Sequence, residues 1–128
     1  MPVKSSIKIL IVDEFTASRK VLVYTLEQLG FENIEEISDG YSALVRLKSA
    51  LFELVITDRE MSKMNGMQLL QQIRADQELK NIPVLMVTED TKPENIVEAT
   101  KAGVNAYIIK PFEIISFAEK MDNIFRGD

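Results

Sequence analysis

Four short apolar runs constrain the fold of this chain more than any other feature of its sequence. They lie at residues 9–12, 54–57, 84–87 and 106–109, and none of them alternates polar with apolar side chains. Continuous runs of about four to six apolar residues are typical of strands that are buried on both faces. The runs therefore predict a parallel sheet with helices on both faces, which is an α/β fold.

Polar residues stand where these runs stop. Asp13 and Glu14 follow the first run, Asp58 follows the second, Thr88 closes the third, and Lys110 closes the fourth. Parallel strands place their carboxyl ends along one edge, and open α/β sheets bind ligands outside that edge. We therefore expect three carboxylates, a hydroxyl and an ammonium group to meet in one crevice.

Strand and helix patterns alternate along the whole chain, which favours repeated βα units. The expected strands cover residues 7–12, 33–37, 54–57, 84–87 and 106–109. The expected helices cover residues 16–29, 41–49, a segment that opens at Gly66, residues 93–102 and residues 113–125. A loop at residues 58–65 joins the third strand to the third helix and is expected to carry functional chemistry.

Composition excludes several classes of function. The chain has 128 residues, a length that fits one domain, and it contains neither cysteine nor histidine. Disulfides, thiolate or imidazole metal sites and a histidine phosphodonor are thus ruled out. The net charge of −5 gives no electrostatic footprint for nucleic acid. The apolar runs are too short for a membrane span and the first residues lack a signal-peptide core, so a cytoplasmic location is expected.

The residues at the strand ends resemble the phosphorylation site of receiver domains from two-component response regulators. Residues 58–66 (DREMSKMNG) resemble the loop after the phosphorylated aspartate, and residues 101–112 resemble the family's Ala-Gly to Lys-Pro segment. The resemblance covers about residues 8–125. It implies a flavodoxin-like (βα)5 three-layer sandwich with strand order 2-1-3-4-5, and residues 1–128 as a single receiver domain.

The resemblance implies a nucleophile and a metal site. Asp58 is the expected phosphoacceptor, since a carboxylate can attack a phosphoryl group. Carboxylates at close range repel one another, and a hard divalent cation with oxygen ligands relieves this repulsion. The expected Mg²⁺ ligands are Asp13, Glu14, Asp58 and the backbone carbonyl of Glu60, and Mn²⁺ is expected to substitute.

Three further roles follow from the same resemblance. Lys110 is expected to contact the phosphoryl oxygens as a compact positive charge. Thr88 is expected to bind the new phosphoryl group, and Tyr107 to move between an outward and an inward rotamer. The phosphoryl group is expected to shift an equilibrium between two conformations that already exist in the unphosphorylated protein, and not to create a new conformation.

The chain also departs from the usual receiver pattern. Glu14 stands where the family has aspartate, Ser62 replaces a proline, and Glu60 occupies a variable position. Glu89 follows Thr88 where a small residue is usual, and we expect its charge to lie at the mouth of the crevice. These departures affect the expected rates and donor preference.

The favoured interpretation is a stand-alone, monomeric response regulator without a separate output domain. Residues 94–96 and Tyr107 are most similar to chemotaxis regulators of the CheY type. This similarity implies a CheA-like histidine kinase as phosphodonor, a flagellar motor switch protein as partner and a possible phosphatase. The partner surface would be formed by residues 93–102, 106–109 and 113–125. No contact with nucleic acid or membrane is expected.

Three alternatives stay open from the sequence. The first is a degenerate receiver that acts as a protein-interaction module with little phosphorylation. The second is a receiver excised from a larger regulator. The third, a metal-dependent phosphohydrolase, is disfavoured because no insertion could supply a lid over a substrate. The favoured protein is not an ordinary enzyme, and its phosphotransfer and dephosphorylation are expected to be self-catalysed.

Overall fold

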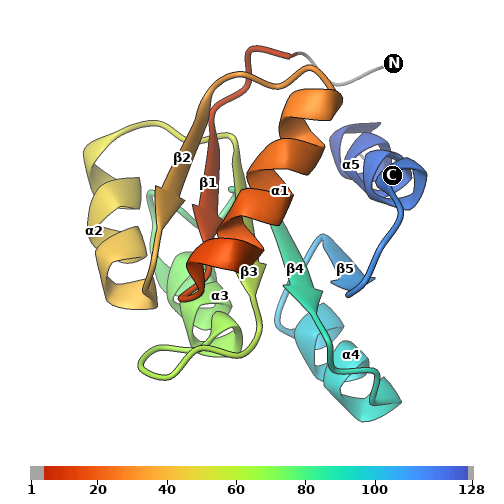
Figure 1. Ribbon diagram of the computed structural model, residues 1–128. Helices are drawn as coiled ribbons and strands as arrows, with labels where there is room; N and C mark the ends of the chain where they lie inside the picture. The colour runs from red at the N-terminus through yellow and green to blue at the C-terminus, as the bar shows by residue number, and fades with distance from the viewer. Residues whose placement is uncertain (1–4, 127–128) are drawn as a thin grey trace.

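A parallel five-stranded sheet forms the centre of the molecule (Figure 1). The computed structural model describes residues 5–126, and its strands follow the order β2-β1-β3-β4-β5. The strands are β1 (Ile9–Val12), β2 (Ile34–Ile37), β3 (Leu54–Asp58), β4 (Val84–Thr88) and β5 (Ala106–Ile109). The predicted flavodoxin-like fold and strand order are thereby confirmed.

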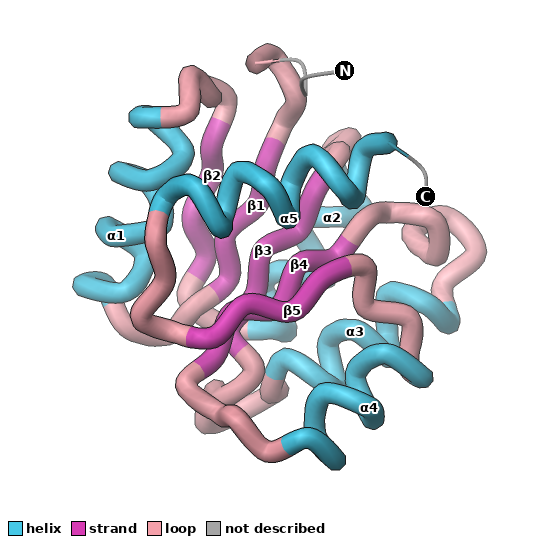
Figure 2. The backbone as a smooth tube through the Cα atoms, turned by 90° about the vertical axis from the view of Figure 1, so that its right-hand side faces the viewer, coloured by secondary structure: helices cyan, strands magenta, loops and turns pink. Residues whose placement is uncertain are grey.

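Helices cover both faces of this sheet (Figure 2). They are α1 (Thr16–Gln28), α2 (Gly40–Ser49), α3 (Gly66–Ala75), α4 (Pro93–Lys101) and α5 (Ile114–Arg126). The α1 and α5 helices lie on one face, and α2, α3 and α4 lie on the other. Within residues 5–126, no helix combines the length and apolar composition that a membrane span needs.

Each face of the sheet packs into its own apolar core because successive strand residues point to opposite faces. Ile11 of β1 belongs to the core that contains Leu26 of α1 and Phe117 of α5. The next residue, Val12, belongs to the core that contains Leu70 of α3. The sheet is therefore enclosed between two apolar cores.

The central strands are buried as predicted, but the prediction for the last strand was wrong. Every residue of β1, β3 and β4 is buried. In contrast, β5 is an edge strand, and only Ile108 of its four residues is buried. The residues of β5 are apolar, yet three of the four are partly exposed to solvent because the strand lies at the edge of the sheet.

The predicted boundaries shift by one or two residues at several element ends. The first strand begins at Ile9 and not at residue 7, and the fifth helix begins at Ile114 and not at residue 113. The change that matters for function is at the end of β3. Asp58 is the last residue of that strand, paired in register with Val87 of β4, so the sheet itself fixes its backbone.

A glycine allows the loop after β3 to fold back against the strand. The Gly66 N–H donates to the carbonyl oxygen of Arg59 at 2.9 Å. A Cβ atom at Gly66 would lie 2.2 Å from the carbonyl oxygen of Asp58, which is closer than real Cβ atoms approach. Asn65 caps α3 at this point, because its side chain accepts the Gln68 N–H at 2.9 Å. The loop therefore depends on the absence of a side chain at residue 66.

Candidate functional site

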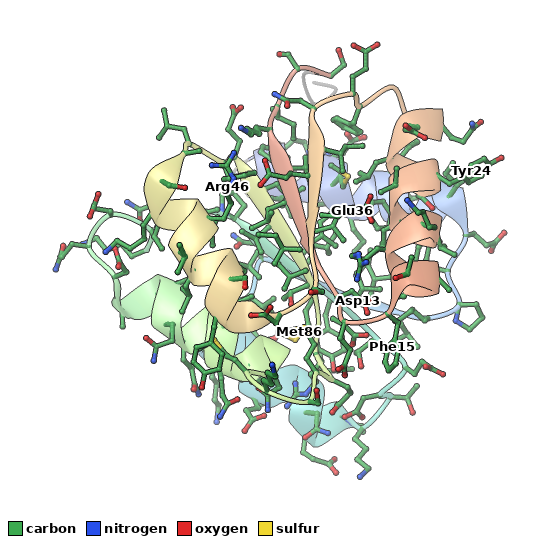
Figure 3. All side chains as sticks on the ribbon, turned by 60° about the vertical axis from the view of Figure 1, so that its left-hand side comes forward. Asp13, Phe15, Tyr24, Glu36, Arg46 and Met86 are labelled. Carbon is green, nitrogen blue, oxygen red and sulfur yellow. The ribbon has the colours of Figure 1, made fainter. Side chains whose placement is uncertain are left out.

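The polar residues predicted at the strand ends lie along one edge of the sheet. Asp58 and Thr88 are the last residues of β3 and β4, while Asp13 and Lys110 directly follow β1 and β5. Their strands run parallel, so these four positions share the lower edge in Figure 1. Figure 3 shows Asp13 at this edge, close to Phe15.

One ammonium group lies between two buried carboxylates. Lys110 Nζ donates to Asp58 Oδ2 at 3.1 Å and lies 3.8 Å from Asp13 Oδ2. Asp13 is fully buried and Asp58 is 6% exposed. The backbone of Lys110 is fixed as well, since its N–H donates to the carbonyl oxygen of Thr88 at 2.8 Å. The site thus has two negative charges and one positive charge in a largely desolvated setting.

Ser18 completes the surroundings of Asp13 and was missed by the sequence analysis. Its hydroxyl donates to Asp13 Oδ2, and Lys110 Nζ donates to Ser18 Oγ at 3.2 Å. The other oxygen of Asp13 accepts the Phe15 N–H at 2.9 Å. A serine in the first turn of α1 carries no distinctive sequence signal, because serine is common near helix starts for capping reasons.

Burial raises the pKa of the Asp58 carboxyl above its ordinary value. The Glu60 N–H, which donates to Asp58 Oδ1 at 3.0 Å, and the Lys110 ammonium act in the opposite direction. The negative charge of Asp13 adds to the rise. Two carboxylates thus face one ammonium, which leaves one negative charge of the site uncompensated.

The structure brings two of the three predicted carboxylates together and turns the third away. The Glu14 carboxylate accepts the Ser62 N–H at 3.1 Å and the Ser62 hydroxyl at 2.8 Å. Across residues 5–126, no three carboxylate, thiolate or imidazole groups are close enough to form a metal-binding cluster. The two departures from the family pattern are thus physically linked, since a proline at residue 62 would offer neither donor.

Thr88 and Tyr107 are close in the sheet but make different contacts. The Thr88 side chain is buried, and its Oγ1 accepts the Asp90 N–H at 3.1 Å. Tyr107 pairs in register with Met86 of β4 and packs against the apolar core. Its hydroxyl oxygen is buried and makes no hydrogen bond of good geometry among residues 5–126. The Arg59 guanidinium acts on this hydroxyl through its charge and weak hydrogen bonding, and both lower the pKa of the Tyr107 phenol against the larger rise that burial causes.

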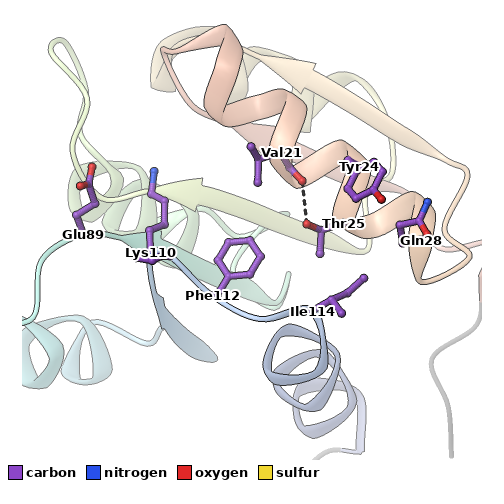
Figure 4. Close-up of a pocket in the computed structure, with 9 residues that line it drawn as sticks. Val21, Tyr24, Thr25, Gln28, Glu89, Lys110, Phe112 and Ile114 are labelled. Carbon is purple, nitrogen blue, oxygen red and sulfur yellow. Dashed lines mark hydrogen bonds between the residues drawn. The ribbon is translucent and has the colours of Figure 1, made fainter.

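Glu89 and Lys110 contribute to the same surface groove. Both residues line one end of a groove of about 670 Å³ between α1 and the segment that joins β5 to α5 (Figure 4). The Glu89 side chain is exposed to solvent. Glu60 is exposed too, and it touches the site through its backbone N–H.

Comparison with known proteins decides the family. Residues 9–122 match the response regulator receiver domain. The chain belongs to the response regulator receiver family. The predicted resemblance is therefore confirmed.

This receiver is closely related to chemotaxis regulators. It is 50% identical over 120 residues to the chemotaxis protein CheY-3 of Vibrio cholerae, which covers 94% of this chain and 92% of that protein. The structure of V. cholerae CheY4 superposes with a TM-score of 0.84 at 29% identity, over 93% of this chain and 98% of that one. The receiver domain of a Pseudomonas aeruginosa sensor histidine kinase, which holds a magnesium ion in its active-site cleft, has a TM-score of 0.82 at 21% identity, covering 94% and 98%.

Replacing Asp58 by asparagine should stabilise the metal-free receiver at neutral pH. A pKa raised by folding means that the Asp58 contribution to stability is complete below its unfolded pKa of about 3.9 and is lost as pH rises through the folded value. At neutral pH the ionised side chain thus costs stability, and Asp58→Asn removes this cost. Urea unfolding with a chelator should give a higher midpoint for the variant, with a difference that shrinks toward acid.

Asp76→Asn is a control of opposite sign. The hydrogen bond from Lys48, 2.7 Å long, is the main reason that the pKa of Asp76 is lowered, so its ionised form supports folding at neutral pH. This variant should be less stable than the wild type, or equal to it, at neutral pH. If Asp58→Asn also failed to raise the stability at neutral pH, burial would not be the main influence on the pKa of the Asp58 carboxyl.

Proposed function

We propose that this receiver accepts a phosphoryl group on Asp58 and passes the signal on as a response regulator. The observation that carries the proposal is the buried Asp58 carboxylate at the sheet edge, with the Lys110 ammonium 3.1 Å from one of its oxygens. In the proposed step, an Asp58 oxygen bonds to phosphorus as the bond from phosphorus to the donor's histidine nitrogen breaks. Lys110 then contacts the transferred oxygens and balances part of their charge.

Mg²⁺ is the proposed cation, held by Asp13, Asp58 and the backbone carbonyl of Glu60. The donor set fits, since Mg²⁺ prefers oxygen ligands, keeps several waters and needs few protein groups. The incomplete compensation of the two carboxylates by Lys110 supports a further cation here. When bound, it supplies positive charge that neutralises the transferred group. The magnesium ion in the Pseudomonas receiver, a protein with the same fold, agrees with this assignment.

The signal then leaves the site through Thr88 and Tyr107. The new phosphoryl group adds about −1.5 to −2 charge and three acceptor oxygens. The Thr88 hydroxyl is drawn toward that charge and gives up its bond to the Asp90 N–H. Space near the end of β4 becomes available to the Tyr107 ring, whose hydroxyl is buried.

Phosphorylation of Asp58 is tested by intact-mass measurement. Incubation with Mg²⁺ and a small acyl-phosphate donor should add one phosphoryl group to the wild type. Asp58→Asn should abolish the adduct, because the nucleophile is lost, whereas Asp76→Asn, at the C-terminal end of α3, should retain it. An adduct on the Asp58→Asn protein would contradict the assignment.

A degenerate receiver is the second candidate, favoured by two observations. The Glu14 carboxylate is turned toward Ser62, and the Glu89 charge lies beside Lys110. Both reduce the attraction of the site for Mg²⁺ or for an anionic donor. A wild-type protein that stays unmodified in the intact-mass experiment would support this candidate.

Ser62→Ala should strengthen Mg²⁺ binding. The change removes the hydroxyl that holds Glu14 and leaves the N–H contact, so the carboxylate turns more readily toward the cation. Loss of one exposed hydrogen bond of about 0.5–1.5 kcal/mol allows a gain of roughly 2- to 10-fold in affinity. NMR titration of the unphosphorylated protein measures it, with Ser49→Ala as a distant control. Equal affinities of Ser62→Ala and wild type would show that Glu14 does not reach the cation.

Chemotaxis supplies the proposed donor and target, since CheY-3 is 50% identical to this chain. The proposed donor is a CheA-like histidine kinase, and the proposed target is a flagellar motor switch protein that contacts α4, β5 and α5. A phosphatase that removes the group is a further proposed partner. The protein is proposed to act as a monomer in the cytoplasm.

Phosphorylation should raise the affinity of the α4-β5-α5 face for an N-terminal peptide of a motor switch protein. A switch of this kind typically supplies about 1–3 kcal/mol, or roughly 5- to 150-fold in affinity. Calorimetry with and without beryllofluoride, in the presence of Mg²⁺, measures the change. Thr88→Ala should reduce it while keeping metal binding. Equal peptide affinity in both states would remove the motor switch from the proposal.

A further inference from the structure

Arg59, the residue after the proposed phosphoacceptor, carries a buried positive charge that points to α4. Its side chain is 9% exposed. Nη1 donates to the carbonyl oxygen of Asn95 at 2.8 Å, and Nη2 donates to a carboxylate oxygen of Glu98. Arginine suits this contact because its planar fork can bond two acceptors at once. The end of β3 is thus bonded to two successive turns of α4.

The same helix is bonded to Thr88 through a second route. The Asp90 N–H donates to Thr88 Oγ1 at 3.1 Å, and the Asn95 side-chain amide donates to Asp90 Oδ2. Asn95 is also the residue whose carbonyl oxygen accepts from Arg59. Thr88 and Arg59 are therefore the two ends of one continuous set of hydrogen bonds that passes through the start of α4.

Few apolar contacts hold α4 in place. Ala99 is its one buried residue, whereas α3 buries five residues, among them Leu69, Leu70 and Ile73. Val97 of α4 is 51% exposed. An element with little buried apolar surface moves at low cost. The bonds from Arg59 are consequently a substantial part of what sets the position of this helix.

Tyr107 lies within the electrostatic reach of Arg59. Burial is the main influence on the Tyr107 phenol and raises its pKa, while the positive charge of Arg59 and weak hydrogen bonding from its guanidinium lower it. The Tyr107 hydroxyl is buried and makes no hydrogen bond of good geometry among residues 5–126. The guanidinium has five N–H donors, so a shift of Arg59 changes the environment of this hydroxyl directly.

We propose that Arg59 is a positioning residue that ties β3 to α4 and holds α4 in the unphosphorylated arrangement. This inference rests on the proposed phosphorylation of Asp58. When the Thr88 hydroxyl turns to the phosphoryl group, the Asp90 N–H loses its acceptor. The hydrogen bond from the Asn95 side chain to Asp90 is then less well supported. The tie between Arg59 and Glu98 then opposes the movement of α4, so removing it favours the phosphorylated arrangement.

Glu98→Gln tests the tie at a distance from the reacting atoms. Glu98 is 59% exposed in its side chain, so the variant should fold. Beryllofluoride with Mg²⁺, a mimic of the phosphoryl group, should bind the variant roughly 2- to 30-fold more tightly, the range of coupling changes seen for such residues. NMR of the unliganded variant should show shifts in α4 and in the Tyr107 ring.

Glu94→Gln is the matched control, because it removes the same charge from an exposed residue of the same helix. It should leave beryllofluoride affinity near the wild-type value. An equal gain in both variants would reflect general electrostatics and would overturn the proposal. Weaker or unchanged binding by Glu98→Gln would overturn it too.

A separate measurement distinguishes failure of this tie from failure of the proposed function. Wild-type protein that binds no beryllofluoride would contradict phosphorylation at Asp58. In that case, a double-mutant cycle of Arg59→Lys and Glu98→Gln, measured by urea unfolding, tests the bond between Arg59 and Glu98. Non-additive effects support the bond between the two side chains, and additive effects overturn it.

Discussion

The shared ammonium of Lys110 is the interaction on which the site depends. It contacts Asp58 at 3.1 Å and lies 3.8 Å from Asp13, and both carboxylates are buried. Two desolvated negative charges without this cation would be strongly unfavourable. One ammonium cannot balance both carboxylates. A negative charge is therefore left uncompensated at the place where the proposed divalent cation and phosphoryl group would bind.

The fold supplies the rigidity that this arrangement needs. Asp58 is fixed by strand pairing with Val87, and the loop after it is closed by Gly66, which lies against the Asp58 carbonyl. The α4 helix is held differently, because Ala99 is its one buried residue and Arg59 bonds it to the end of β3. A site fixed by strand pairing, next to a helix with little buried apolar surface, is a physical basis for the proposed conversion of a local change of charge into a change of surface.

The sheet and four residues of the site could be predicted from the sequence, because apolar runs indicate strands and parallel strands place their carboxyl ends along one edge. Asp13, Asp58, Thr88 and Lys110 were located in this way. The orientation of Glu14 could not be, since it depends on Ser62, which is 48 residues away in sequence and supplies two donors from another loop. The bond between Arg59 and Glu98 could not be predicted for the same reason, since the two residues are 39 positions apart in sequence. Ser18 was missed because a serine near a helix start carries no distinctive signal.

Titration of the Asp58 carboxyl by ¹³C NMR, in wild type and in Lys110→Met without divalent cations, tests the central interaction most directly. Burial raises the pKa of Asp58 and the Lys110 ammonium lowers it. The wild-type carboxyl should therefore titrate above its ordinary value, and it should titrate higher still in Lys110→Met. A wild-type value at or below the ordinary one, or equal values in the two proteins, would contradict the account.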